Sequence, residues 1–221
     1  MRGDVLMVEI VSWTRELARR LEQAFGPRLR FVGYQGSYGR GEATPDSDID
    51  VVAVLDCLDV EDLARYRDLV KSMPSGELAC GFICGAEQLA AWPRADLLSL
   101  YLDTRPVLGA LELPEFTQAE YGQALALGAS ALYHGACHGY LYNGAAEALP
   151  GLRKGAFFCL RLERLWRAGE YVPALGELRS RLTKEQREML DTPDVERAYR
   201  LLLEWSGSVL KSLRPLCGDK P

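Results

Sequence analysis

The sequence predicts an α+β fold in which a sheet-containing half is followed by an all-α helical bundle. Short apolar runs typical of strands alternate with helical spacing only in the first half of the chain. Beyond the proline-containing segment Leu111–Glu115, apolar residues keep helical spacing to about Leu213. We therefore expect Leu111–Glu115 to be the linker between one domain at residues 1–112 and a second at residues 113–221.

The first half is expected to alternate helices with short strands. Helical spacing of apolar residues predicts the first helix, which Gly26-Pro27 should end. Three short apolar runs predict buried strands, and Asp59 or Asp62 can cap the helix before the third strand. The expected elements are a helix over 5–25, strands over 29–34 and 49–55, a helix over 59–73, a strand over 78–84 and a helix over 87–92.

The second half is expected to contain only helices. Its first helix should run over 117–149 and its second over 152–168, with further helices continuing to residue 213. Pro150-Gly151 and Pro173 are expected to interrupt them.

Composition excludes several classes of protein. The chain has 221 residues, 48% of them hydrophobic, which is ordinary for a globular protein. Its formal net charge of -5 argues against a nucleic-acid binder, and no apolar run is long enough to span a membrane. The N-terminus does not resemble a signal sequence, and the six cysteines lack paired spacing. We expect reduced thiols and a cytoplasmic protein.

A glycine-rich turn followed by two acids is the most informative motif. Residues 36–41 read Gly-Ser-Tyr-Gly-Arg-Gly, and Asp48-Ile49-Asp50 opens the second strand. Glycines leave room for phosphates to approach backbone amides, Ser37 can donate to a phosphate oxygen, and Arg40 can neutralise phosphate charge. Asp48 and Asp50, two apart in an extended chain, face the same side. Carboxylates in this setting suit Mg2+, and two such ions can stabilise phosphoryl-type transfer.

Gly36-Ser37, ten intervening residues and Asp48-Ile49-Asp50 resemble the signature of the DNA polymerase β-type nucleotidyltransferase superfamily. The small bacterial members, minimal and aminoglycoside nucleotidyltransferases, are most similar. The resemblance implies a mixed sheet with flanking helices, followed by a helical domain that closes over the nucleotide. It also implies two Mg2+ ions and transfer of a nucleoside monophosphate, expected to be AMP from ATP, to a hydroxyl with release of pyrophosphate.

The resemblance implies a third carboxylate, from a later strand, as metal ligand or base. The expected strand over 78–84 contains no acid. Glu77, at its beginning, is the nearest candidate for this catalytic role. An alternative alignment puts Cys80 at the position of the acid.

Basic residues of the helical half are expected to reach the phosphates. In aminoglycoside-modifying relatives one helix ends in a pattern with an arginine, a tryptophan and a later lysine, and residues 161–175 are similar. Arg161 or Arg164 matches the arginine, depending on register. Ala174 or Leu175 stands where the lysine should be, and Lys154 is the candidate substitute. We expect Lys154 and Arg161 to bind nucleotide.

Two histidines, His134 and His138, share one face of the expected helix over 117–149. No glutamate lies between them as in the zinc hydrolase motif H-E-x-x-H, so a hydrolytic zinc site is not expected. A structural pair is favoured over a role in the acceptor pocket.

Three functions remain open on the sequence. The favoured one is an enzyme that transfers a nucleotidyl group to a small molecule, for example an aminoglycoside-like antibiotic, in a monomer or a homodimer. A second is an antitoxin-like enzyme that AMPylates a protein. A third is a nucleotide-binding or regulatory module that has lost turnover, which the doubtful third acid motivates.

Overall fold

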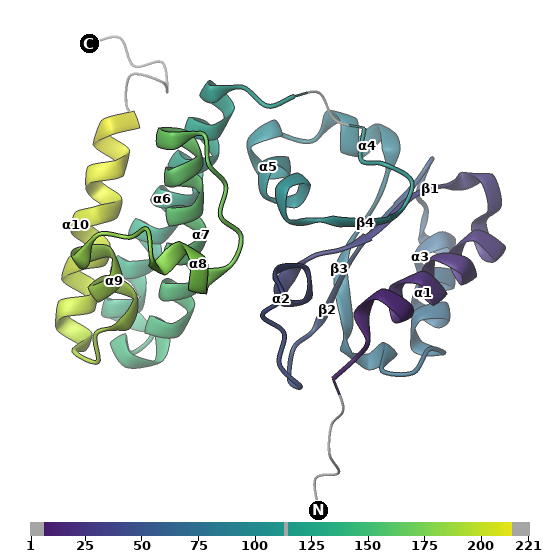
Figure 1. Ribbon diagram of the computed structural model, residues 1–221, viewed down its shortest axis with the longest axis horizontal. Coiled ribbons are helices and arrows are strands. Elements are labelled where there is room, and N and C mark those ends of the chain that lie inside the picture. Colours follow the sequence, from purple (N-terminus) through teal and green to yellow (C-terminus); the bar gives the residue numbers. More distant parts are fainter. Residues whose placement is uncertain (1–6, 113–114, 214–221) are drawn as a thin grey trace, which may run out of the picture. The chain divides into compact units, whose positions relative to one another are not determined.

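The computed structural model describes residues 7–112 and 115–213. A mixed four-stranded sheet with flanking helices forms the N-terminal part, and a helical region follows it (Figure 1). The chain divides into two compact units. We call them the sheet unit, residues 1–93 and 99–114, and the helical unit, residues 94–98 and 115–221. The α+β class is confirmed.

The sheet has the strand order β3-β2-β1-β4. β1 is antiparallel to both β2 and β4, whereas β2 and β3 are parallel. The bounds are β1 Leu29–Tyr34, β2 Ile49–Leu55, β3 Ala79–Gly85 and β4 Arg105–Leu108. The first three strands match the expected ranges to within one residue. β4 was not predicted, and it lies at a sheet edge, where its Pro106 is tolerated.

Helices and single 3-10 turns surround the sheet. The predicted helix over 5–25 begins later, at Ile10, and residues 5–6 lie outside the described part of the chain. Asp59 and Asp62 both act at the start of α3, where they form a reciprocal capping box. The glycine-rich turn contains a short helix, α2, and α5 was not predicted. The bounds are α1 Ile10–Phe25, α2 Gly36–Arg40, α3 Val60–Lys71, α4 Ala86–Ala91, α5 Arg94–Asp103, and 3-10 turns at Gly26–Arg28 and Gly76–Leu78.

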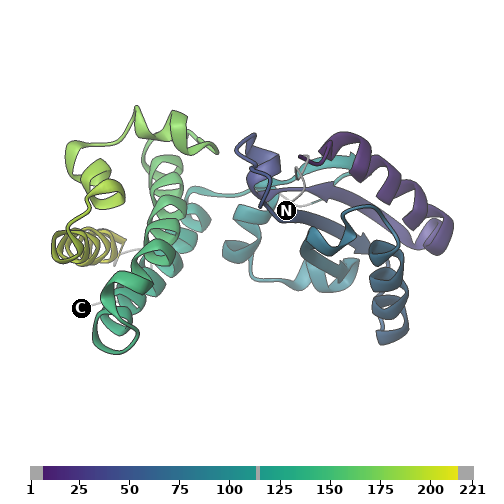
Figure 2. The ribbon, with the colours of Figure 1, turned by 90° about the horizontal axis from the view of Figure 1, so that it is seen from below.

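One face of the sheet carries the main core of this unit. Ile49 and Val51 of β2 are fully buried in a cluster with apolar residues of α1 and α3. Because side chains alternate along a strand, Asp50 faces the other side of the sheet. The course of α1 along the strands can be followed in Figure 2. The alternation therefore keeps the acid out of the main core.

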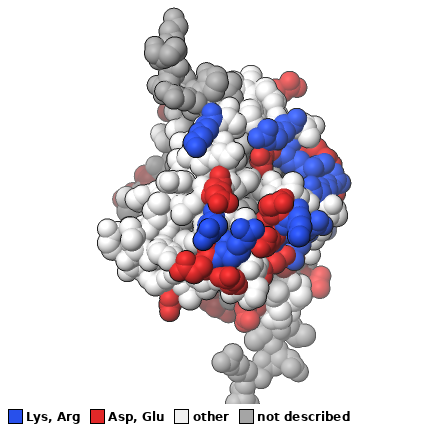
Figure 3. Space-filling view, turned by 90° about the vertical axis from the view of Figure 1, so that its left-hand side faces the viewer, with Lys and Arg blue, Asp and Glu red and all other residues white. Residues whose placement is uncertain are grey.

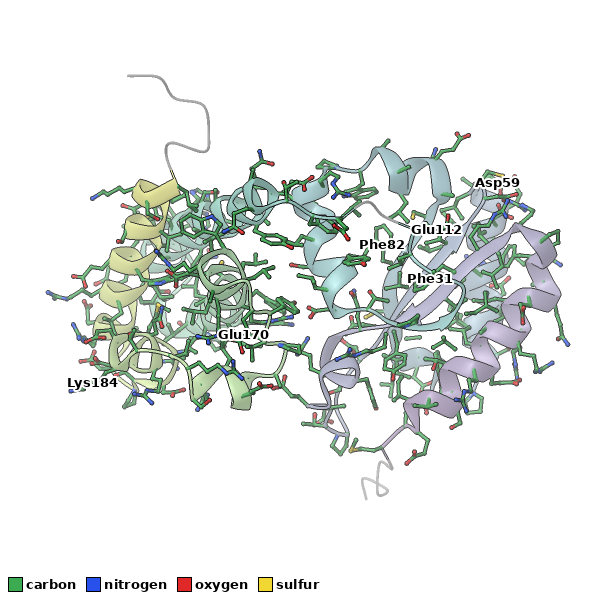
Figure 4. All side chains as sticks on the ribbon, turned by 45° about the horizontal axis from the view of Figure 1, so that its top comes forward. Phe31, Asp59, Phe82, Glu112, Glu170 and Lys184 are labelled. Atoms are coloured by element: carbon green, nitrogen blue, oxygen red, sulfur yellow. The ribbon has the colours of Figure 1, made fainter. Side chains whose placement is uncertain are left out.

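The opposite face is partly aromatic. Phe31 of β1 is buried, and the ring of Phe82 on β3 meets Trp92 edge-on, with 5.5 Å between ring centroids. Figure 4 labels Phe31 and Phe82. By strand register, Phe31 and Phe82 lie on the same face of the sheet as Asp50.

The helical unit contains two long helices separated at a place that was wrongly predicted. α6 ends at Tyr142 and α7 begins at Ala145, so the break lies at Asn143-Gly144 and not at Pro150-Gly151. Pro150 is inside α7. Only the bond to the carbonyl of Ala146, an exposed residue, is lost there, and water can replace it. The bounds are α6 Gln118–Tyr142, α7 Ala145–Ala168, α8 Leu175–Arg179, α9 Lys184–Asp191 and α10 Val195–Leu213.

α6 packs against both α7 and α10. On the face shown in Figure 3, acidic and basic side chains are interspersed. The ion pairs of this unit include Arg197–Glu188 and Arg179–Asp191, with nitrogen–oxygen distances of 2.9 and 2.6 Å.

Within the described ranges, no helix has the length and apolar character needed to cross a membrane.

Candidate active site

Asp50 lies at the centre of the candidate site. It is the second residue of β2 and is half-buried. The backbone N–H of Gln35, just before α2, donates to the Asp50 carbonyl at 2.9 Å. Across the sheet, Cys80 of β3 is its register partner, and the Cys80 thiol donates to Asp50 Oδ1 with 3.3 Å between sulfur and oxygen. The turn and the neighbouring strand therefore both fix this residue.

Gly36 brings the backbone of the turn directly against the Asp50 carboxylate. A Cβ at position 36 would lie 2.7 Å from Asp50 Cγ and would overlap Oδ2. The φ of Gly36 is +67°, a left-handed conformation that favours glycine. Only glycine satisfies both requirements here without moving the carboxylate.

The rest of the turn is held by α2 and by contacts to β4. Tyr38 of α2 is buried in the core, so its neighbours Ser37 and Arg40 are left partly exposed. Arg40 Nε lies 3.0 Å from Glu42 Oε2. Arg105 of β4 donates from Nε to the Gly39 carbonyl at 3.2 Å. The two residues expected to bind phosphate are thus on the turn beside Asp50, with Arg40 in an ion pair.

Asp48 is exposed immediately before β2 begins. Across residues 7–112 and 115–213, neither Asp48 nor Asp50 has a salt bridge to a basic side chain. In the same ranges, no group of three or more His, Cys, Asp or Glu side chains is arranged to hold a metal ion. The Asp50 carboxylate beside the Gly36 backbone, with Asp48 two residues before it, nevertheless fits a divalent ion that takes its remaining ligands from water and phosphate.

The structure places Glu77 outside β3. It is exposed in the 3-10 turn Gly76–Leu78, three residues before Cys80. Cys80 occupies the strand position opposite Asp50. Gly81, with a φ of +130°, lets β3 pass against the backbone of Val51, where a Cβ would overlap the Val51 carbonyl. The register thus gives Cys80, and not Glu77, the direct contact to Asp50.

The basic residues expected to bind nucleotide are on α7 of the helical unit. Lys154 is exposed. Arg161 is only 1% exposed, and its guanidinium lies 4.6 Å from the ring centroid of Tyr171, whose hydroxyl accepts a hydrogen bond from it. These contacts hold the Arg161 side chain in the interior of the helical unit.

The two histidines of α6 are exposed, and their ring centroids are 6.0 Å apart. The His138 ring also lies 5.1 Å from that of Tyr142. They form an aromatic row on the helix surface.

Three residues that support the turn were missed from the sequence. Gln35 and Arg105 contact the turn as described, and the Thr104 hydroxyl donates to Gln35 Oε1 at 3.4 Å. Thr104 and Arg105 are distant in sequence from the turn and reach it only because β4 pairs with β1. No local pattern marks them.

Most of the sheet unit matches a known protein family. Residues 14–102 match the family model described as a nucleotidyltransferase domain. No curated protein matches the chain.

One solved structure with a TM-score above 0.5 shares the fold. A spectinomycin adenyltransferase from Enterococcus faecialis, solved with ATP and spectinomycin, is 14% identical with a TM-score of 0.57, and the match covers 89% of this chain and 97% of that one. A nucleotidyltransferase-like protein from Exiguobacterium sibiricum is 12% identical with a TM-score of 0.38, covering 90% and 74%. Residues 14–102 thus match a nucleotidyltransferase domain, and the likeness to the spectinomycin adenyltransferase shows that the chain shares its fold.

Proposed function

We propose that the chain transfers AMP from ATP to a hydroxyl group of a small molecule, in a reaction that requires Mg2+ at Asp48 and Asp50. The observation that carries the proposal is the contact between Asp50 and the glycine turn. Because Gly36 has no side chain, its backbone lies directly against the carboxylate, so a triphosphate bound by the turn would lie next to an ion bound by Asp50.

The chemistry follows from what must change in the reaction. The acceptor oxygen forms a bond to the α-phosphorus of ATP, and the bond from that phosphorus to the bridging oxygen of pyrophosphate breaks. The acceptor proton passes to a base or to water. Bound Mg2+ would neutralise charge on the phosphates. The protein's own part is to orient the triphosphate on the turn, with Ser37 as the candidate hydroxyl donor and Arg40 as the candidate cation.

The acceptor is proposed to be a small molecule of the aminoglycoside type. The support is the architecture of a sheet unit followed by a helical unit, which this chain shares with the spectinomycin adenyltransferase over 89% of its length. Glu77 as base and Lys154 and Arg161 as nucleotide ligands remain part of the proposal. Arg161, buried against Tyr171, has the least support among them.

Pyrophosphate release tests the proposal. The full chain is incubated with ATP, Mg2+ and a panel of aminoglycoside and aminocyclitol acceptors, and product mass is measured in parallel. Asp48→Asn and Asp50→Asn should each lower the rate by at least about 10²-fold, because metal stabilisation of phosphate charge contributes several kcal/mol. Asp46→Asn is the matched control, since Asp46 is an exposed acid of the same loop. Equal rates for all three variants would contradict the assigned roles.

One observation favours a second candidate, a module that binds nucleotide without turnover. The strand position opposite Asp50 holds a thiol and not a carboxylate. ATP binding that depends on Asp50 but gives no pyrophosphate with any acceptor would support this candidate. Failure to bind ATP at all would exclude both.

A further inference from the structure

The Cys80 thiol lies next to the Asp50 carboxylate, which is proposed above to bind a metal ion. The two side chains project from register partners of adjacent parallel strands, β2 and β3. Cys80 is exposed, and its sulfur lies 3.3 Å from Asp50 Oδ1. The other carboxylate oxygen, Oδ2, faces Gly36. A metal ion held by Oδ1 would therefore have the thiol as its neighbour on one side.

The sulfur–oxygen distance suits two ligands of one ion. Metal–sulfur and metal–oxygen bonds of about 2.3 and 2.1 Å, meeting at about 90–110°, put the two ligand atoms about 3.1–3.6 Å apart. The observed 3.3 Å lies within that interval. The strand register sets this spacing, and Gly81 permits it by letting β3 approach the backbone of Val51. No rearrangement of either strand is needed for joint coordination.

We propose that Asp50 and Cys80 jointly coordinate one divalent ion, and that the sulfur makes this position prefer Co2+ or Zn2+ over Mg2+. Thiolates bind borderline and soft metals, whereas Mg2+ takes oxygen ligands almost exclusively. Water and phosphate oxygens complete the coordination. The inference rests on the proposed function and changes its metal at one position: the ion at Asp50 still holds the triphosphate, but it is a borderline metal and not Mg2+. It makes Cys80 a residue that determines metal specificity.

Cobalt provides a direct readout that does not depend on turnover. Co2+ is titrated into the reduced full chain, and the thiolate-to-cobalt charge-transfer absorption in the near ultraviolet is followed. The wild type should show the band. Cys80→Ser should abolish it, and Asp50→Asn should weaken Co2+ binding by about 10-fold or more, the usual scale for a disrupted metal site.

Cys57→Ser is the matched control, because Cys57 is the other exposed cysteine of the sheet unit. It is expected to leave the band unchanged. Circular dichroism checks that each variant is folded. Co2+ binding without the band in the wild type, or a band that persists in Cys80→Ser, would overturn the inference.

A second measurement tests metal preference. Mg2+ should displace bound Co2+ poorly from the wild type and at least about 10-fold better from Cys80→Asp, which replaces the sulfur ligand by a carboxylate oxygen. Equal displacement from both would contradict the role of the sulfur. Pyrophosphate release with Mg2+ but no cobalt–thiolate band would leave the proposed function intact and reject this inference. A cobalt–thiolate band without nucleotidyl transfer to any acceptor would support this inference and reject the proposed function.

Discussion

At the scale of single residues, the site depends on one contact between a backbone and a carboxylate. Asp50 is set on the face of β2 opposite the main core, and Gly36 lets the turn close against it. Neither an aspartate nor a glycine by itself indicates a phosphate-binding site. Their combination places a negatively charged group beside backbone that can approach a phosphate closely.

Gly36→Ala should therefore abolish most of the activity while leaving the chain folded. The new Cβ would displace the Asp50 carboxylate, and the residue would also carry the cost of a positive φ. Gly41→Ala is the matched control, because Gly41 has a similar φ of +72° but no atom within 4 Å of the added Cβ. Transfer rates and denaturant midpoints are measured for both.

We expect similar losses of stability in the two variants, on the order of 1–2 kcal/mol. Activity should fall at least about 10-fold further in Gly36→Ala, the scale of a misplaced catalytic group. Similar activities in the two variants would show that overlap with Asp50 has no consequence.

At the scale of elements, α6 is anchored at its start by an ion pair. Thr117 and Glu120 form a reciprocal capping box, and Arg94 donates from Nε to Glu120 Oε1 at 2.6 Å. The Arg94 guanidinium and the Thr117 N–H lower the pKa of Glu120 from 4.5 to about 2. The carboxylate thus ties the beginning of α5 to the beginning of α6.

Glu120 should make stability depend on pH. Its pKa is lower in the folded chain than in the unfolded chain, so its contribution is complete above about pH 4.5 and declines as the pH falls towards 2. Glu120→Gln keeps the capping pattern but removes the charge, and should cost about 1 kcal/mol at pH 7. Glu120→Ala also removes the cap and should cost more.

Urea denaturation between pH 7 and pH 2 measures the difference between wild type and Glu120→Gln. We expect the difference to shrink as the pH falls through this interval. Glu115→Gln is the control, because the structure gives Arg94 a bond to the Glu115 backbone carbonyl, which the substitution retains. A difference that stays constant with pH would contradict the assigned role of the charge.

The elements that could be predicted from sequence are those with a local cause. β1 and β2 are short apolar runs, and the start of α3 is marked by its own capping residues. α2 and β4 could not be predicted in this way. α2 is a five-residue helix rich in glycine, and β4 contains Pro106 and exists because β1 accepts it at the sheet edge.

The candidate site, too, has a part that local sequence predicts and a part that depends on contacts between distant residues. Gly36, Asp48 and Asp50 are close in sequence, and their spacing predicted a shared site, of which the structure shows the contact between Gly36 and Asp50. The contact between Asp50 and Cys80 depends on the register of two strands 30 residues apart, which no local pattern determines. Pro150 shows the converse error, since a local rule predicted a break that the packing of α7 overrides.

At the scale of the whole molecule, each unit has its own stabilising interactions. The core beneath α1 and α3 contains only residues of the sheet unit, and α6, α7 and α10 pack within the helical unit. In the sheet unit, Arg28 holds Asp62 through bonds of 2.9 and 2.6 Å and lowers the pKa of that carboxyl. In the helical unit, Arg94 likewise donates to the Glu120 carboxylate and lowers its pKa.

Substitutions in the two units should therefore act independently. Asp62→Asn breaks the ion pair with Arg28 and Glu120→Ala breaks the one with Arg94, and the two pairs share no residue. We expect the change in unfolding free energy of the double variant to equal the sum of the single changes within about 0.5 kcal/mol. Calorimetry and urea denaturation at pH 7 measure all four proteins. A deviation above about 1 kcal/mol would show that the two ion pairs are energetically coupled, and would contradict the independence of the two units.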